Sequence, residues 1–88
     1  MPAVSPNVRV KVLFFGHLRE LTGLSEENGE ISEGATLGDL LERYIQRFPP
    51  LAGFRSALVA SRNQEFAPWD TRIASGDEIA FLPPVSGG

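Results

Sequence analysis

The sequence predicts an α+β fold in which one main helix packs across one face of a mixed sheet of four or five strands. Three observations indicate this fold: an apolar alternation over Val8–Phe15, a helical periodicity over Thr36–Phe48, and an apolar strand over Asp77–Leu82. Shorter segments between them are typical of a helical turn and of further strands. Elements in this order form two layers around one core.

The first strand is predicted over Val8–Phe15 because apolar and polar side chains alternate there. One face has an apolar residue at every second position, namely Val8, Val10, Val12 and Phe14. The other face begins with Arg9 and Lys11 and becomes apolar at Leu13 and Phe15. A neighbouring element must cover these last two side chains, or they form an apolar patch.

Two short elements are predicted after this strand. His17–Leu21 reads as one or two helical turns closed by Thr22-Gly23, and Glu30–Ser32 as a short strand.

The main helix is predicted over Thr36–Phe48. Apolar residues there recur at the spacing of one helix face: Leu37, Leu40, Leu41, Tyr44, Ile45 and Phe48. Thr36 is expected to accept a hydrogen bond from the amide of Asp39, with Asp39 as the acidic member of a capping box. Pro49-Pro50 ends the helix. At roughly 1.5–3 kcal/mol for each fully buried side chain, this stripe is expected to be the largest local contribution to stability.

The remaining strands are predicted in the second half of the chain. In order, we expect a loop at Leu51–Phe54, a strand at Ala57–Ser61, a turn at Asn63-Gln64, a short return strand at Glu65–Ala67, a polar connection at Asp70–Gly76 and a final strand at Asp77–Leu82.

Length and composition predict a single domain. The chain has 88 residues, of which 42% are hydrophobic and 22% charged, so it can fill one core and is neither disordered nor membrane-spanning. We expect residues 1–7 to form an N-terminal extension, residues 8–82 the domain, and residues 83–88 an extended C-terminal tail.

Charge and local composition exclude several classes of function. The net charge is −3 and the basic residues are spread along the chain, so no nucleic-acid partner is expected. The N-terminal residues lack the features of a signal peptide and no apolar run approaches a bilayer-spanning length, so we expect a cytoplasmic protein without a membrane partner. The absence of cysteine excludes disulfides, thiolate nucleophiles and thiolate zinc sites.

The last six residues, Pro83-Pro84-Val85-Ser86-Gly87-Gly88, have a composition suited to entering another protein's active site. Pro83 and Pro84 have a fixed φ and no N–H, so they end strand pairing and lower the ordering cost of an extended tail. Gly87 and Gly88 have no Cβ, so a narrow channel can close around their backbone. At ~3.3 Å per residue, the tail can extend about 20 Å from the sheet.

The carboxylate of Gly88 is inert until it is activated. Transfer to ATP would form an acyl-adenylate, and a persulfide could then displace AMP and leave a thiocarboxylate. In this way a chain without cysteine could carry sulfur. The alternative is a solvated terminus without a function, which is common at chain ends.

Several motifs together suggest a family. They are Lys11-Val12-Leu13-Phe14-Phe15 with Leu18-Arg19-Glu20-Leu21, then Asn63-Gln64, Gly76-Asp77-Glu78-Ile79-Ala80-Phe81 and the six-residue tail. From Val8 to Gly88 the chain resembles the small, sulfur-carrying subunit of molybdopterin synthase, which has a ubiquitin-like β-grasp fold. Residues 1–7 and the loop after Pro49 match no part of that pattern.

The resemblance implies a role in molybdenum cofactor biosynthesis. A ubiquitin-activating-like adenylyltransferase would adenylate Gly88 with ATP, and a sulfur donor system would convert it to the thiocarboxylate. The tail would then insert into the large subunit of the synthase and donate sulfur to a cyclic pyranopterin precursor. The chain would be a non-catalytic subunit that stably holds no metal or cofactor, and the catalytic residues would lie on the large subunit.

The resemblance also implies a partner interface formed by Phe15, Phe66 and Leu82. Strand alternation independently leaves Phe15 and Leu82 without an inward position, and exposed apolar patches usually mark interfaces. The alternative is that the domain covers these side chains with its own loops.

Other functions and roles stay open on the sequence alone. The chain could be a carrier for another, thiamine-type pathway, a protein modifier attached through Gly88, or a binding module that uses only the sheet face. His17 is expected to be a surface or helix-capping residue and Trp69 to pack over the sheet. An acidic run is expected to form a solvated face: Glu26, Glu27 and Glu30.

Overall fold

A computed structural model describes residues 7–83 of the chain. The predicted extension, apart from Asn7, and the predicted tail residues Pro84, Val85, Ser86, Gly87 and Gly88 lie outside this described part. In order, the elements are β1 (Asn7–Phe14), α1 (His17–Thr22), β2 (Glu26–Ser32), α2 (Leu37–Arg47), the 3₁₀ helix η1 (Pro49–Ala57), β3 (Val59–Arg62), β4 (Glu65–Ala67) and β5 (Glu78–Leu82).

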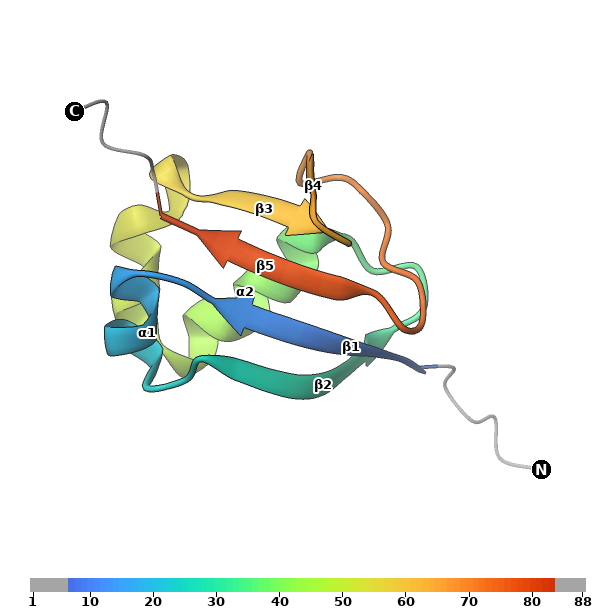
Figure 1. The fold of residues 1–88 in the computed structure, drawn as a ribbon, viewed down its shortest axis with the longest axis horizontal. Coiled ribbons are helices and arrows are strands. Elements are labelled where there is room, and N and C mark those ends of the chain that lie inside the picture. Colours follow the sequence, from blue (N-terminus) through green and yellow to red (C-terminus); the bar gives the residue numbers. More distant parts are fainter. Residues whose placement is uncertain (1–6, 84–88) are drawn as a thin grey trace.

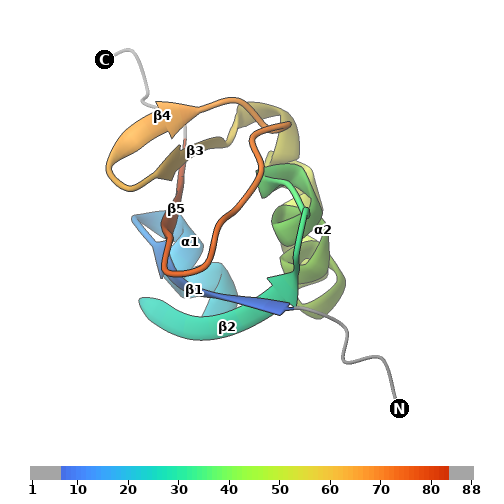
Figure 2. The same cartoon turned by 90° about the vertical axis from the view of Figure 1, so that its right-hand side faces the viewer.

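The five strands form one mixed sheet in the order β2-β1-β5-β3-β4. β1 and β5 pair in parallel at its centre, and the other pairs are antiparallel. α2 lies across one face, whereas no element covers the other face within the described part (Figures 1 and 2). The predicted α+β class, with a mixed sheet and one main helix across it, is confirmed.

The core lies between the sheet and α2. The alternation in β1 buries every second side chain: Val8, Val10, Val12 and Phe14. The stripe on α2 meets them with four buried residues, Leu37, Leu40, Leu41 and Tyr44, while Ile45 and Phe48 are partly buried. Aromatic rings dominate the centre, where Phe14 lies 5.0 Å from Tyr44 and 5.9 Å from Phe81, measured between ring centroids.

The predicted ends of α2 are confirmed. The hydroxyl of Thr36 accepts a hydrogen bond from the amide of Asp39, and the carboxylate of Asp39 accepts one from the amide of Thr36, which completes the capping box. The helix ends at Arg47, two residues before the Pro49-Pro50 pair.

Several boundaries differ from the sequence-based expectation. β1 begins at Asn7, which pairs with Ser32, so this residue belongs to the sheet and not to the extension. β2 is seven residues long instead of three because its whole length pairs with β1. The segment expected to form a loop at Leu51–Phe54 lies within η1, which buries Leu51 against the core.

The strand expected at Ala57–Ser61 is shifted to Val59–Arg62 because Ala57 lies in η1, and the first and last strands differ from expectation by one residue, at Phe15 and Asp77. The predicted turn and the packing of Trp69 are confirmed. Asn63 and Gln64 both have positive φ, 53° and 72°, as a tight two-residue hairpin turn between β3 and β4 requires. Trp69 is half-buried and stacks on Phe81 with ring centroids 6.1 Å apart. Within residues 7–83, no helix combines the length and apolar character needed to cross a bilayer.

Candidate functional site

The point where the tail leaves the domain lies at the end of β5, between β1 and β3. Phe81 pairs with Phe14 of β1, and Leu82 pairs with Val59 of β3. In Figure 1 the C-terminal end of β5 lies beside α1 and η1, and β1 begins at the opposite end of the molecule. Pro83, the last described residue, therefore leaves from a central strand that is held on both sides.

Gly16 leaves room for the first residue of the tail. It has φ of +57°, and a Cβ added to it would lie 3.1 Å from Cγ of Pro83, so the proline ring packs directly against the Gly16 backbone. The start of the predicted tail is thus in contact with the corner between β1 and α1.

An apolar surface lies next to this point, on the face of the sheet that α2 does not cover. We name it the open-face patch and define it by six side chains: Leu13, Phe15, Val59, Phe66, Ala80 and Leu82. Strand register brings four of them together, because Leu13 pairs with Ala80 and Val59 pairs with Leu82. Phe66 is 78% exposed, Val59 41% and Phe15 36%.

The three predicted interface residues lie together on this patch. Phe15, Phe66 and Leu82 line one shallow hollow, whose other lining residues are Leu13, Ser61, Gln64, Glu78 and Ala80. No loop of the described part covers Phe66, whereas Leu82 is half-buried. The structure therefore places these residues where a partner could contact them, and their role in binding stays a prediction.

Val59 is a member of the patch that the sequence did not predict. Its position in a strand was expected, but the face it occupies depends on pairing with Leu82 and follows only from the register of β3 on β5.

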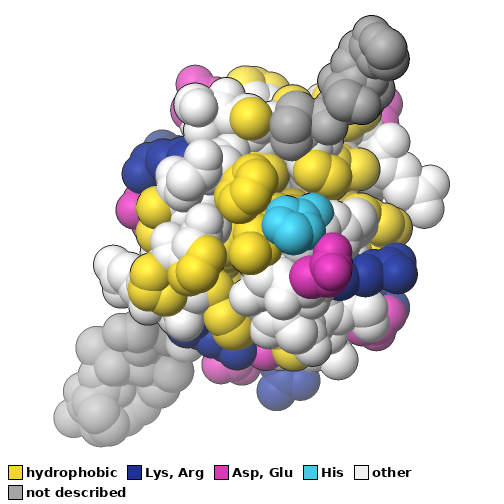
Figure 3. Space-filling model, turned by 90° about the vertical axis from the view of Figure 1, so that its left-hand side faces the viewer, with side chains coloured by type: hydrophobic (Ala, Val, Ile, Leu, Met, Phe, Trp, Pro, Cys, Tyr) yellow, Lys and Arg dark blue, Asp and Glu magenta, His cyan; other side chains and the backbone are white. Residues whose placement is uncertain are grey.

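The corner formed by α1 closes one side of the patch. The guanidinium of Arg19 lies over the ring of Phe15, and its Nε donates a 3.0 Å hydrogen bond to the carbonyl of Phe14. His17 pairs with Glu20 at 3.0 Å and meets the ring of Phe54 edge-on, as expected for a surface residue. Figure 3 shows hydrophobic side chains gathered around the single histidine at this end of the molecule.

A buried carboxylate fixes the register of β5. Asp77 accepts hydrogen bonds from Nε of Arg62 at 2.6 Å, from Nδ2 of Asn63 at 3.0 Å and from the amide of Ala74 at 2.7 Å. Burial acts to raise the pKa of Asp77, but these three hydrogen bonds and the charge of Arg62 outweigh it and hold the pKa below its usual range. This cluster connects the β3–β4 turn to the start of β5.

The acidic run of β2 is only partly a solvated face, which corrects the expectation. Glu27 is partly buried and accepts hydrogen bonds from Arg47 at 2.6 and 3.1 Å and from the hydroxyl of Tyr44 at 2.8 Å. The hydrogen bond from Arg47 is the main reason that the pKa of Glu27 lies below its usual value. Burial, followed by the bond to Glu27, raises the pKa of Tyr44. The cluster joins α2 to β2 and therefore serves the fold.

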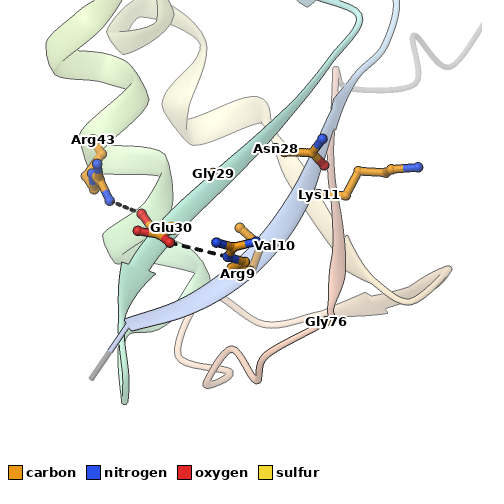
Figure 4. Close-up of a pocket in the computed structure, with 8 residues that line it drawn as sticks. All are labelled: Arg9, Val10, Lys11, Asn28, Gly29, Glu30, Arg43 and Gly76. Atoms are coloured by element: carbon orange, nitrogen blue, oxygen red, sulfur yellow. Dashed lines mark hydrogen bonds and ion pairs between the residues drawn. The ribbon is translucent and has the colours of Figure 1, made fainter. Parts of the chain in front are cut away.

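A second hollow lies near the other end of the sheet, around Glu30. Figure 4 shows Arg9 and Arg43 directed toward Glu30 from β1 and α2, and Lys11 directed away. Arg9 pairs with the Glu30 carboxylate at 3.4 Å, and Arg43 donates to the Glu30 carbonyl at 2.5 Å. The negative charge of Glu30 thus offsets part of the positive charge of Arg9 and Arg43. Nowhere in residues 7–83 do three acidic or histidine side chains gather as a metal site would require.

Comparison with known proteins identifies similar chains. A model described as the ThiS family matches residues 12–88. The molybdopterin synthase sulfur carrier subunit of Chlamydomonas reinhardtii is 39% identical over 83 residues, which cover 92% of this chain and 100% of the relative.

The solved structures that share the fold include the following two. One is the complex of subunits 1 and 2 of molybdopterin-converting factor from Helicobacter pylori, with a TM-score of 0.61, 29% identity and coverage of 92% of this chain and 100% of the matched chain. The other is small archaeal modifier protein 1 of H. volcanii, with a TM-score of 0.78, 28% identity and coverage of 89% and 99%.

Proposed function

Because the chain belongs to the ThiS family, we propose that it is the sulfur carrier subunit of a molybdopterin synthase. The observation that carries this proposal is the similarity to curated sulfur carrier subunits over almost the whole chain, together with a family match that extends to Gly88.

The proposed chemistry takes place at Gly88. The carboxylate attacks the α-phosphate of ATP on an adenylyltransferase, and pyrophosphate leaves. The terminal sulfur of a donor persulfide then displaces AMP from the acyl-adenylate and forms an acyl disulfide. A thiol attacks the donor-side sulfur of this disulfide, forms a disulfide with the donor and releases Gly88 as a thiocarboxylate. The thiocarboxylate sulfur attacks the cyclic pyranopterin precursor on the large subunit, where we place the acid–base residues. Water then hydrolyses the resulting thioester, which leaves the sulfur on the pterin and returns Gly88 as a carboxylate. We place the reaction in the cytoplasm, since adenylation consumes ATP.

The geometry of the described part supports this role. Pro83 leaves the sheet beside Phe15 and Leu82, so a partner that holds the open-face patch would also receive the tail. Patch and tail would then act as two parts of one docking site. The structure from Helicobacter pylori, a complex of subunits 1 and 2 of molybdopterin-converting factor, supports a large subunit as the partner.

Reconstitution with a chain that lacks Gly88 tests the proposal. Purified chain, adenylyltransferase, ATP, sulfur donor, large subunit and pyranopterin precursor are combined, and the dithiolene product is measured. We expect the deletion to abolish product formation while the melting temperature and the binding to the large subunit persist. Product formed at the normal rate without Gly88 would refute the carrier role.

Experiments in cells distinguish a protein modifier from a sulfur carrier. A modifier leaves its terminal glycines on lysines of other proteins, and mass spectrometry of digested cell protein detects these remnants. A carrier leaves none, and its deletion removes molybdoenzyme activity. The structural similarity to an archaeal modifier protein makes this comparison necessary.

A further inference from the structure

The corner between β1 and α1 places a cationic side chain against a residue of the open-face patch. The guanidinium carbon of Arg19 lies 5.7 Å from the centroid of the Phe15 ring, within the range of a cation–π interaction. The Nε of the same side chain donates a 3.0 Å hydrogen bond to the carbonyl of Phe14. Arg19 therefore spans from the helix to the end of the strand and limits the positions open to the Phe15 ring.

Backbone hydrogen bonds hold both residues of this contact. The amide of Arg19 donates to the carbonyl of Gly16 at 3.1 Å, and its carbonyl accepts from the amide of Gly23 at 2.7 Å. The carbonyl of Phe15 accepts from the amide of Leu18 at 3.2 Å. The Cα atoms of Arg19 and Phe15 are thus fixed relative to each other, so the guanidinium acts on a defined ring position.

We infer that Arg19 is a positioning residue for partner docking, which holds the Phe15 ring in place on the open-face patch before the partner binds. Ordering a side chain on binding costs conformational entropy and therefore weakens binding. If the Phe15 ring is already held in place, this cost is smaller. This inference rests on the proposed function, because it takes Phe15 as a contact of the large subunit.

A simpler alternative is that Arg19 only stabilises the strand–helix corner. In that case its loss would lower the stability of the domain, and any effect on binding would be the same whether or not Phe15 is present. A positioning role predicts instead that the effect on binding depends on the Phe15 ring. A double-mutant cycle on affinity separates the two.

The experiment measures the Kd of the full chain for the large subunit by calorimetry. The variants are Arg19→Gln, Phe15→Ala and the double variant. We expect Arg19→Gln to weaken binding about 5-fold in the wild-type background and less than about 2-fold in the Phe15→Ala background. Arg19→Lys, which keeps the charge without the planar guanidinium, is expected to weaken binding about 2- to 3-fold.

Arg72→Gln is the matched control for the loss of one positive charge. Arg72 is exposed and makes no side-chain hydrogen bond or ion pair with any residue in the described range. We expect its Kd to stay within about 2-fold of wild type, since isolated exposed charges contribute little.

Equal effects of Arg19→Gln in both backgrounds, or an effect no larger than that of Arg72→Gln, would overturn the inference. If Arg19→Gln lowers the melting temperature strongly, the cycle is repeated with Arg19→Lys, and an equal effect on Kd with and without the Phe15 ring again overturns the inference. If Phe15→Ala itself leaves the Kd unchanged, the proposed docking contact at Phe15 fails and the inference fails with it. Loss of binding with Phe15→Ala, but not with either Arg19 variant, would refute the inference alone.

Discussion

Phe14 and Phe15 are adjacent in the chain and lie in opposite environments. Phe14 is 1% exposed and packs against Tyr44 and Phe81 beneath α2, whereas Phe15 is 36% exposed on the uncovered face of the sheet. The same contrast separates Phe81, which is 0% exposed, from Phe66, which is 78% exposed. Similar aromatic side chains therefore serve stability on the covered face, and we propose that they serve binding on the open face.

The largest expected effect is on the covered face. Phe81→Ala removes a ring that contacts Phe14, Tyr44 and Trp69, and the cavity left behind should lower the free energy of unfolding by about 3–5 kcal/mol. Urea denaturation followed by circular dichroism measures this. A loss below ~1 kcal/mol would contradict the assignment of this face as the core.

Phe66→Ala is the matched change on the open face. Since Phe66 is exposed, the free energy of unfolding should stay within about 0.5 kcal/mol of wild type. The affinity for the large subunit should fall at least about 10-fold, as for a central aromatic contact. The comparison between the faces breaks down if Phe66→Ala destabilises the domain as much as Phe81→Ala does.

Asp77→Asn tests the register on which both faces depend. The hydrogen bonds to Asp77 hold its pKa below the unfolded value, so its contribution to stability is present above about pH 4 and is lost as the pH falls through the folded pKa. We expect the variant to be about 1–2 kcal/mol less stable at pH 7. The loss is modest because Arg62 is partly exposed, so solvent screens its attraction to Asp77. The difference should shrink below pH 4, as measured by denaturation across pH 3–7. A difference that does not depend on pH would contradict this role.

The smallest expected effect concerns the N-terminal cap of α2, the helix that packs over the core. Thr36→Ala removes the hydroxyl that caps α2 and should lower stability by about 1 kcal/mol. The affinity for the large subunit should not change, because α2 covers one face of the sheet (Figure 2) and strand pairing places the open-face patch on the other. A parallel loss of affinity would show that the two faces do not act independently.

The elements that the sequence predicted well are those with a strong local pattern. The alternation in β1 and the stripe and capping box of α2 are local features, and the structure reproduces both. The Asn63-Gln64 turn follows from residues that tolerate positive φ.

The elements that were underestimated depend on tertiary contacts. Residues 26–29, Glu-Glu-Asn-Gly, have no strand character of their own and form β2 because β1 pairs with them. Leu51–Phe54 was expected to be a loop, yet it lies within η1, which buries Leu51 in the core.

The candidate site likewise contains residues that the sequence identifies and residues that depend on tertiary contacts. Phe15 and Leu82 could be identified because strand alternation gave them no inward position, and Phe66 because of the family resemblance. Val59 joins them only through its register with Leu82, which no local pattern encodes. The contact of Arg19 with Phe15 likewise depends on the corner at Gly16, where the chain turns from β1 into α1.

Intact-mass spectrometry of the chain tests the central claim most directly. The full chain is incubated with the adenylyltransferase, ATP and a sulfur donor, and the chain lacking Gly88 is treated in parallel. We expect the full chain to gain the mass difference between sulfur and oxygen, located by fragmentation at Gly88, and the shortened chain to keep its mass. An unchanged mass of the full chain, with the adenylyltransferase shown to be active, would contradict the account.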